Sequence, residues 1–335
     1  MESSKYFIRA SNKGGFVVSN YFVVGGAGFI GSHVVRRLIH DDVGNVTVFD
    51  NFSSGKKEHL SEAIHDNRLK IIEGDIKDMD AIAAAMEGAN IVYSLASNPD
   101  IAKAVVQPDI DFWEGTYLIN NIVEAMRRNG VKNLIYASGS GVYGDVGATV
   151  TDEDFAPMLP ASTYGASKLA CEALICSYCH MFDMNAGAFR FANVVGPNQT
   201  HGVGYDFINR LLENPKELRI LGDGTQSKSY IYVDDIVNAL RIVEKRHLNG
   251  YSYYNVATLD HISVTEIADI VVEIMGLTDV RYDYTGGDRG WKGDVPIVRL
   301  STDKIRKLGW SNKYTAKQAI RMSVSSMYEG KKSGS

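Results

Sequence analysis

The feature that most constrains this chain is a short apolar run that breaks into a cluster of glycines. Residues 21–24 are followed by Gly25, Gly28 and Gly31, and apolar residues then recur at helical spacing over 30–39. This pattern predicts a strand, a tight turn and a helix. Glycines let the turn approach a phosphate closely, and the first N–H groups of the helix point at it. The sequence therefore predicts a phosphate-binding turn.

An acidic residue after the next apolar run indicates which ligand this turn binds. Asp50 ends the run 46–49 and lies nineteen residues past Gly31. There a carboxylate can accept hydrogen bonds from a ribose and would repel a 2′-phosphate. We therefore expect NAD rather than NADP as the cofactor.

Further apolar runs alternate with helical patterns along the first half of the chain. They cover 69–73, 91–95 and 134–137, and the clearest helical pattern spans 118–126. Such alternation predicts an α/β fold, a Rossmann-type doubly wound parallel sheet with ligands at the carboxyl ends of its strands. The strand ends expected around the adenine and its ribose carry Asp75, Ile76, Leu95, Ala96 and Ser97.

The regular alternation ends near residue 195, where segments rich in Gly, Asn and Pro begin. We expect a smaller α/β C-terminal substrate lobe there, while residues 229–243 read as one more strand and helix that return to the first lobe. The expected division is a flexible leader at 1–19, an NAD-binding domain at 20–192 plus about 226–257, and a substrate lobe at about 193–225 plus 258–330.

A tyrosine and a lysine four residues apart supply candidate chemistry. Tyr164 and Lys168 open a helical pattern, and a spacing of four places both side chains on one face. A phenol is a poor base near neutrality, but a nearby ammonium stabilises its phenolate. Tyr164 can then take a proton from a substrate hydroxyl while a nicotinamide takes the hydride. Lys168 is also expected to hold a cofactor ribose hydroxyl.

Composition excludes several other classes. The formal net charge of −5 provides no basic face for nucleic acid. No apolar stretch is long enough to span a membrane, and the N-terminal residues are too polar for a signal peptide. The three cysteines, an odd number, favour a reducing compartment, so a cytoplasmic location is expected. Residues 176–180 match a haem-attachment pattern, but they continue the helix after Lys168, and we expect neither haem nor metal.

With these motifs in place, the sequence resembles the extended short-chain dehydrogenase/reductase family, and within it the archaeal-type UDP-glucose (UDP-galactose) 4-epimerases. The likeness runs from about residue 21 to about residue 325. It is carried by residues 24–32, 50–55, 74–76, 140–144, 164–168, 190–197, 228–235 and 293–296.

The resemblance implies a set of site residues. Around NAD it adds Phe29, Ile30, Asn51, Ser53, Ser54 and Gly55 to the residues named above. For the nucleotide-sugar substrate it implies Asn98, Asn193, Phe207, Arg219, Leu221, Lys228, Tyr230, Arg289 and Asp294. Lys228 stands where many relatives carry an arginine that grips the diphosphate, and a lysine can do so only as a point charge.

The resemblance also implies a reaction and an assembly. The reaction is reversible oxidation at C4 of a UDP-hexose, such as UDP-glucose, UDP-galactose or an N-acetyl form. A transient 4-keto sugar turns over in its pocket before hydride returns to its other face. The implied assembly is a homodimer formed through two helices, one of which bears Tyr164.

The sequence departs from the family pattern at two places. Where the family carries a Ser or Thr that bridges the sugar and the catalytic tyrosine, this chain has Gly139, flanked by Ser138 and Ser140. We hypothesise that Ser140, or a water in the vacated space, replaces this hydroxyl, although strand alternation would turn both serines away. The candidate catalytic set is thus Tyr164, Lys168, Ser140 and Ser138. Glu114 stands where relatives tend to carry asparagine, near the cofactor.

Two alternative functions remain open. A nucleotide-sugar 4,6-dehydratase would accumulate a 4-keto-6-deoxy sugar, but Ser140 and Gly141 occupy the places where such enzymes generally carry Asp or Glu. A catalytically weak member that only binds NAD is suggested by Gly139 and Glu114. Tyr164 and Lys168 argue against it, because a pure binding module has no need of that pair.

Overall fold

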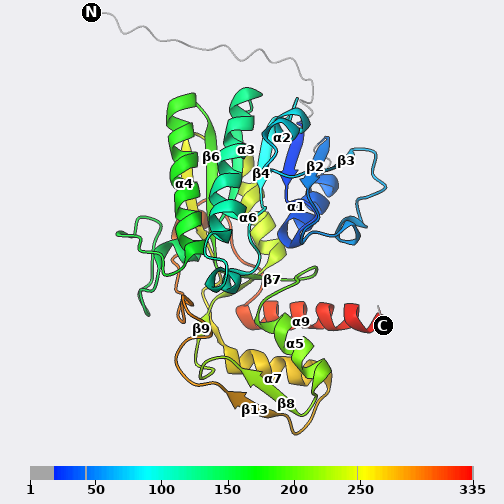
Figure 1. Cartoon of the computed structure of the whole chain (residues 1–335), viewed down its shortest axis with the longest axis vertical. Helices are drawn as coiled ribbons and strands as arrows, with labels where there is room; N and C mark the ends of the chain where they lie inside the picture. Colours follow the sequence, from blue (N-terminus) through cyan, green and yellow to red (C-terminus); the bar gives the residue numbers. More distant parts are fainter. Residues whose placement is uncertain (1–18, 42–43, 247, 334–335) are drawn as a thin grey trace, which may run out of the picture.

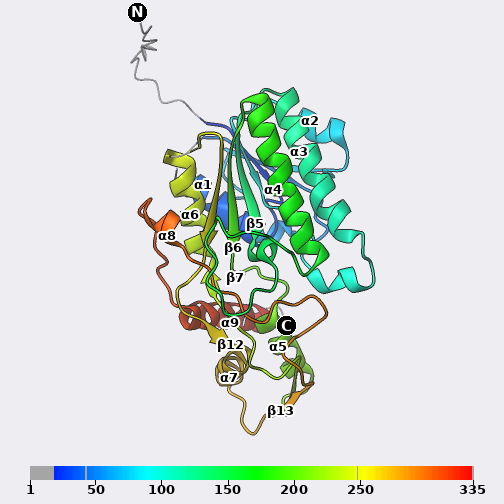
Figure 2. The ribbon, with the colours of Figure 1, turned by 90° about the vertical axis from the view of Figure 1, so that its left-hand side faces the viewer.

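The computed structural model describes residues 19–41, 44–246 and 248–333, so the leader expected at 1–19 lies outside the described residues except for its last position. A parallel sheet lies between two layers of helices, and a second group of helices and short strands lies below the sheet (Figure 1, Figure 2). The chain ends at the last helix of this second group.

The central sheet has seven strands in the order β11-β6-β5-β4-β1-β2-β3, and each pairs in parallel with its neighbours. Its strands are β1 (Tyr21–Val24), β2 (Val46–Asp50), β3 (Leu69–Glu73), β4 (Ile91–Ser94), β5 (Asn133–Gly139), β6 (Asn185–Phe191) and β11 (Tyr251–Val256). The strand order reverses between β1 and β4, which is where ligands bind in open α/β sheets. The predicted doubly wound α/β fold is confirmed.

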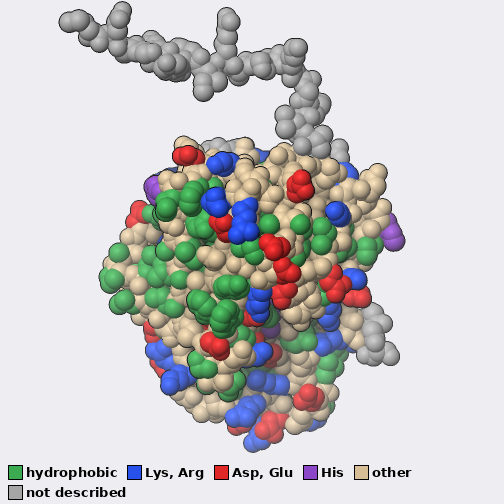
Figure 3. Space-filling model, turned by 45° about the horizontal axis from the view of Figure 1, so that its top comes forward, with side chains coloured by type: hydrophobic (Ala, Val, Ile, Leu, Met, Phe, Trp, Pro, Cys, Tyr) green, Lys and Arg blue, Asp and Glu red, His purple; other side chains and the backbone are tan. Residues whose placement is uncertain are grey.

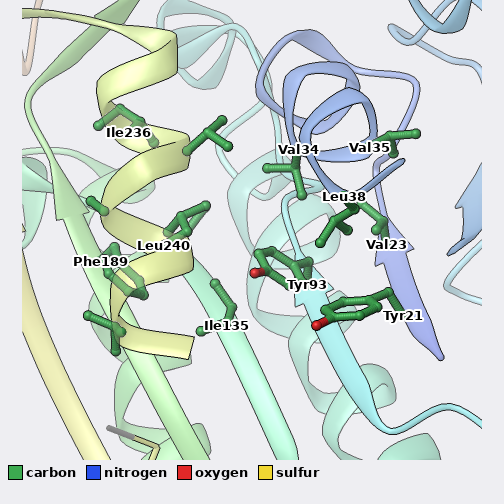
Figure 4. Packing of buried hydrophobic residues seen from close by; sticks show 14 of the residues in the cluster. Tyr21, Val23, Val34, Val35, Leu38, Tyr93, Ile135, Phe189, Ile236 and Leu240 are labelled. Atoms are coloured by element: carbon green, nitrogen blue, oxygen red, sulfur yellow. The ribbon is translucent and has the colours of Figure 1, made fainter. Parts of the chain in front are cut away.

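Each face of the sheet carries its own apolar core. One face packs against α2 (Met79–Ala85), α3 (Tyr117–Arg128) and α4 (Thr163–Phe182). The other packs against α1 (Phe29–His40) and α6 (Val233–Arg246), and Figure 4 shows side chains of these two helices above those of β1, β4, β5 and β6. Because both faces are covered, the strands read as nearly continuous apolar runs.

The second group of elements has a separate core below the carboxyl ends of the strands. It comprises β7 (Asn193–Val195), α5 (Val203–Glu213), β8 (Glu217–Ile220), β9 (Ser227–Lys228), β10 (Tyr230–Tyr232), β12 (Ile262–Ser263), α7 (Val264–Met275), β13 (Arg281–Tyr284) and α9 (Ala316–Ser333). A short helix, α8 (Asp303–Arg306), instead packs against β11.

The strand and the helix expected at residues 229–243 belong to different groups of elements in the structure. The strand, β10, pairs with β7 and not with the central sheet. Helix α6 packs against α1 and β6, and β11 then joins the central sheet. The chain therefore crosses between the two groups of elements within a few residues, which brings both to the same cleft.

Short helical turns shape the approach to the central helices. Within the described residues, 3-10 turns occur at η1 (Lys57–Leu60), η2 (Ile101–Val105) and η4 (Ser140–Tyr143), and a π-helical turn, η3 (Phe112–Thr116), precedes α3. Helix α4 begins after Ser162, whose hydroxyl accepts the Gly165 N–H at 3.1 Å. This cap fixes Tyr164 in the first turn of α4.

The described part of the chain shows no membrane-spanning helix, no disulfide and no metal cluster. Among its helices, none combines the length and apolarity that a bilayer span requires. Lys and Arg side chains lie interspersed with Asp and Glu on the face drawn in Figure 3. The cysteines are unpaired along α4, and the described residues form no cluster of three or more His, Cys, Asp or Glu suited to a metal ion.

Candidate active site

A cleft of about 940 Å³ lies where the carboxyl ends of the sheet strands face the second group of elements. One wall comes from the glycine turn, the ends of β2 to β5 and the start of α4. The other comes from β7, α5 and the segments around β8 to β10. A cleft between two such walls can hold an extended ligand, such as a dinucleotide together with a second nucleotide.

The glycine turn fits a diphosphate. Gly25 has a φ of +74°, and a Cβ there would lie 2.7 Å from the Ala96 nitrogen. A Cβ on Gly31 would lie 2.1 Å from the Gly25 carbonyl oxygen, so the helix packs directly on the turn. No acidic residue occupies the first turn of α1, which leaves its N–H groups and positive dipole end open to an anion.

Asp50 ties the glycine turn to the end of β2. Its Oδ2 accepts the Ala27 N–H and its Oδ1 accepts the Phe52 N–H, both at 2.9 Å. A carboxylate has about four acceptor positions, so acceptor capacity remains for a ribose hydroxyl. The side chain is buried but borders the cleft. This arrangement fits the NAD ribose and disfavours a 2′-phosphate.

Tyr164 and Lys168 lie on the cleft side of α4 at the end of β5. The Lys168 Nζ donates to the Ala137 carbonyl at 2.8 Å and lies 5.4 Å from the centre of the Tyr164 ring. Lys168 is 6% exposed, whereas Tyr164 is half-buried and borders the cleft. An ammonium has three donors, so two remain for a ribose hydroxyl and for the space beside the phenol.

The three residues at the end of β5 differ in what they reach. Gly139 is extended, and a Cβ there would meet only the Tyr164 Cε1, at 4.0 Å. Ser138 also borders the cleft, but its hydroxyl donates at 2.5 Å to the Oε1 of Glu172, a residue that does not border it. Ser140 lies beyond the strand as the first residue of η4, half-buried at the cleft. The strand thus ends before Ser140, so strict alternation does not apply to it.

An ion pair lies on the far wall of the cleft. Lys228 Nζ donates to Asp294 Oδ1 at 2.7 Å and lies 5.4 Å from the centre of the Trp291 ring. Beside it, burial and the Asp294 carboxylate raise the pKa of Tyr230, which therefore stays a neutral phenol. The other predicted substrate residues that line the cleft are Asn98, Asn193, Phe207 and Leu221.

Comparison with known proteins assigns the family. Residues 21–257 match the model of the NAD dependent epimerase/dehydratase family. The chain belongs to this family. Its NAD dependence confirms the cofactor predicted from the sequence.

Similar proteins cover almost the whole of this epimerase/dehydratase chain. It is 31% identical over 309 residues to the UDP-glucose 4-epimerase of Mycolicibacterium smegmatis, covering 90% of this chain and 96% of that protein. It is 29% identical to the putative UDP-glucose 4-epimerase of Methanocaldococcus jannaschii, an archaeal protein, covering 91% and 97%. The solved UDP-glucose 4-epimerase of Thermotoga maritima with UDP-glucose has a TM-score of 0.83 at 30% identity, covering 93% and 99%. The resemblance stated from the sequence motifs is thus confirmed.

Three predicted site residues of this family member do not border the cleft. Gly55 is buried behind Asp50, since a Cβ there would lie 2.9 Å from the Ala27 backbone. Arg219 has an exposed side chain on β8. Arg289 donates to the Asp294 carbonyl at 2.8 Å and to the Asp145 Oδ2 at 2.5 Å. The remaining predicted cofactor residues line the cleft, namely Gly25, Gly28, Phe29, Ile30, Gly31, Asp50, Asn51, Ser53, Ser54, Asp75, Ile76, Leu95, Ala96, Ser97, Tyr164 and Lys168.

Glu114, the acid that departs from the family pattern, is neutralised by a neighbour. It borders the cleft from η3 and pairs with Lys77, which follows β3. Hydrogen bonding to Glu114 raises the pKa of Lys77, so Lys77 remains a cation beside this carboxyl group near neutrality. The family motifs give no signal for Lys77, because its partner lies 37 residues away.

A second group of charged residues in the cleft was not predicted. Asp100, His201, Asp206 and Arg210 come from the loop after β4, the loop before α5 and α5 itself. Burial lowers the pKa of His201 and raises that of Asp206. The sequence offers one signal, the position of residues 200–202 just before the helical pattern that carries Asp206 and Arg210. That pattern is typical of many surface helices, so it does not identify a binding site.

Proposed function

We propose that this chain catalyses NAD-dependent epimerisation at C4 of a UDP-hexose, either UDP-glucose and UDP-galactose or their N-acetyl forms, through a transient 4-keto sugar. The observation that carries the proposal is the position of Tyr164 and Lys168 at the floor of one cleft. The glycine turn lies at one end of this cleft, and the Lys228–Asp294 pair lies on the opposite wall. Relatives with similar chains over almost their whole length are named UDP-glucose 4-epimerases.

In this proposal the phenol of Tyr164 accepts the proton of the C4 hydroxyl and later returns it. Lys168 stabilises the phenolate and orients a cofactor ribose hydroxyl through its remaining donors. When bound, NAD supplies reversible hydride transfer to and from the sugar carbon. Gly139 leaves open space beside the phenol, where Ser140 or a water serves as the bridging hydroxyl.

The two walls divide recognition between cofactor and substrate. The glycine turn, Asp50 and the ends of β3 and β4 hold NAD. The far wall holds the nucleotide diphosphate, with Lys228 as a point charge on the phosphates and Asp294 as an acceptor for ribose hydroxyls. We propose an NAD-binding domain of residues 20–192 plus about 233–257 and a substrate lobe of about 193–232 plus 258–330. The boundary expected at about 226 moves to about 233 because β9 and β10 pair with β12 and β7 of the second group.

A homodimer is part of the same proposal. Phe112 and Trp113 on η3 are 50% and 45% exposed, and Met181 near the end of α4 is 71% exposed. Large apolar side chains exposed along neighbouring helices support an association surface. Light scattering coupled to size-exclusion chromatography measures the assembly directly.

A dehydratase remains the second candidate, because the family includes that reaction. Elimination at C5 and C6 requires a further acid or base beside the sugar. Ser140 and Gly141 border the cleft directly after Gly139, and neither carries a carboxyl group. Epimerisation needs no such group, so the local chemistry favours it.

The experiment is incubation with UDP-glucose, UDP-galactose and their N-acetyl forms, with products resolved by NMR. An epimer at C4 is expected, and Tyr164→Phe should reduce its formation by at least about 10²-fold because proton transfer is lost. Accumulation of a 4-keto-6-deoxy sugar would establish the dehydratase instead. Unchanged sugars in the presence of bound NAD would point to a binding protein.

A further inference from the structure

A second charged residue follows the catalytic pair on the same face of α4. Tyr164, Lys168 and Glu172 are each four residues apart, so their side chains form one row along the helix. Glu172 is 4% exposed and no part of it borders the cleft. A buried carboxylate one turn from Lys168 would ordinarily attract the ammonium away from the phenol, so its charge must be balanced elsewhere.

Arg190 of β6 balances this carboxylate. Its Nε donates to Glu172 Oε1 at 3.0 Å and its Nη2 donates to Oε2 at 2.7 Å, a bidentate pair. The hydroxyls of Ser138 on β5 and Tyr251 on β11 also donate to this carboxylate, at 2.5 and 3.3 Å. These donors occupy the acceptor positions of the Glu172 carboxylate and leave none for the Lys168 ammonium.

The guanidinium is fixed on its other side as well. Its Nη1 donates to the Tyr143 hydroxyl at 2.9 Å and to the Glu153 carbonyl at 2.8 Å. Burial by itself would lower the pKa of Arg190, but the Glu172 carboxylate raises it above its usual value, so the cation persists. The Tyr143 hydroxyl in turn donates to the Asn255 Oδ1 at 2.7 Å. Arg190 thus occupies one fixed position beneath the site.

Other titratable groups around α4 leave this balance intact. On β5, burial raises the pKa of Tyr136 well above its usual value, so it stays neutral beside Lys168. Burial likewise raises the pKa of Cys171.

The carboxylates of neighbouring segments have partners of their own. From the segments before α3, Asp111 accepts the Thr163 hydroxyl at 2.7 Å and Glu114 is paired with Lys77. On the network's outer side, burial raises the pKa of Glu153.

We propose that Arg190 is a positioning residue for the Tyr164–Lys168 pair: by neutralising Glu172, it reserves the Lys168 charge for the Tyr164 phenolate. With Glu172 occupied, the Lys168 ammonium bonds the neutral Ala137 carbonyl, and its field acts on the phenol. The inference rests on the proposed function only in taking Tyr164 as the proton acceptor.

The test measures ionisation of Tyr164 without any sugar. The ultraviolet absorbance of phenolate is titrated in the NAD-loaded protein, and the titration of Tyr164→Phe in the same background is subtracted. Glu172→Gln removes a negative charge and should move the titration midpoint to lower pH by roughly one unit, as expected for a charge about 12 Å along the helix in a partly screened interior. Arg190→Gln leaves Glu172 unbalanced and should move the midpoint to higher pH. The double variant should return it close to the wild-type value.

The two single variants are expected to shift the midpoint in opposite directions, which distinguishes a change in charge balance from general damage to the fold. If both single variants shift the midpoint in the same direction, or if neither shifts it, the proposal is wrong. Ser138→Ala removes a neutral donor to Glu172 and should leave the midpoint unchanged, so a shift equal to that of Glu172→Gln would also overturn it. This variant and Glu172→Gln decide the matter if Arg190→Gln does not fold.

The opposite face of the sheet offers a matched control. Arg241 and Glu244 form a buried ion pair on α6, with side chains 3% and 4% exposed, and Glu244 accepts hydroxyls from Tyr21 and Tyr93. Replacing this pair by two glutamines should affect stability similarly and leave the Tyr164 titration in place. A failure of sugar turnover with the predicted titration shifts intact would reject the proposed substrate but retain the role of Arg190.

Discussion

At the scale of single residues, the space around a backbone position decides what this site tolerates. Gly31 and Gly28 share one turn, yet a Cβ on Gly31 would lie 2.1 Å from the Gly25 oxygen, while on Gly28 its nearest contact is 3.2 Å. The two glycines of one motif therefore carry different constraints. Gly139 differs from both, since added atoms there face open space toward Tyr164.

Replacing Gly31 by alanine should separate α1 from the turn. We expect Gly31→Ala to destabilise the protein by about 1–3 kcal/mol, as overpacking does, and to weaken NAD binding. Gly28→Ala is the control, with a smaller loss of stability. Thermal unfolding and NAD titration measure both effects, and equal losses for the two variants would contradict this reading of the turn.

Gly139→Ser should be tolerated, because the backbone there is extended and the new Cβ has room. We expect activity to stay the same or to rise, since the hydroxyl enters the space beside the Tyr164 ring. Gly139→Ala separates the effect of the hydroxyl from that of the added carbon. Steady-state kinetics on both variants is the measurement, and a large loss with serine would count against Ser140 or water as the substitute hydroxyl.

At the scale of elements, α4 is the part that joins chemistry to framework. Its first turn carries Tyr164, its second presents Lys168 to the end of β5, and its third anchors Glu172 to β6. It also packs against the neighbouring helix α3, where the Tyr178 hydroxyl lies 3.5 Å from the Glu124 carboxylate. The orientation of the helix is thus set from several sides.

The ion pairs of α3 should make this region sensitive to acid. Hydrogen bonds from Arg127, and then from Arg128, lower the pKa of Glu124 to about 2. A carboxylate whose pKa is lower in the folded than in the unfolded chain stabilises the folded state at pH values above its unfolded pKa. This stabilisation is lost as the pH falls through the folded pKa of about 2. Because the arginines are partly exposed, we expect Glu124→Gln to cost only about 0.5 kcal/mol near neutrality and nothing near pH 2.

Chemical unfolding over a series of pH values measures this difference. Glu87→Gln is the control, because Glu87 is exposed and makes no ion pair within the described residues. A constant difference between wild type and Glu124→Gln at every pH would show that the glutamate acts through packing and not through its charge.

At the scale of the whole molecule, the cleft joins two separately packed groups of elements. The chain crosses between them at β7 and again at β10, which pair with each other. Lys228, on the far wall, lies on β9, just before the second crossing. A ligand that fills the cleft contacts both groups and should couple their stabilities.

Ligand binding should therefore stabilise the molecule in two distinguishable steps. NAD at about one hundred times its Kd should add about 2.7 kcal/mol to the free energy of unfolding. UDP should then slow amide exchange in α5, β8 and β10 more than in α1. Hydrogen exchange with mass spectrometry measures this, and Lys228→Met should remove the UDP effect while it leaves the NAD effect. Protection by UDP confined to α1 would contradict the assigned far wall.

The sequence by itself determined the features that depend on neighbouring residues. The glycine turn, the acid at the end of β2 and the Tyr164–Lys168 spacing are local, because backbone geometry and helical periodicity fix them within a few residues. The first two of these features indicated NAD. The doubly wound fold also required the alternation of apolar runs with helical patterns, and the family required further motifs along the chain. The ends of β1 to β4 were predicted to within one residue, since apolar runs buried on both faces stop where the sheet stops, whereas β5 extends two residues beyond its expected run and β6 and β11 were not predicted.

Tertiary structure alone decided which distant groups meet. Packing brings Arg190 to Glu172 across 18 residues, Ser138 to Glu172 across 34 and Arg289 to Asp145 across 144. It also brought Lys77 to Glu114, and it placed the Glu172 carboxylate within reach of the Ser138 hydroxyl, which strand alternation already turns away from the phenol. No local pattern encodes such pairings, because each depends on how strands and helices from different parts of the chain are stacked, and that stacking fixes where each buried charge finds its balance.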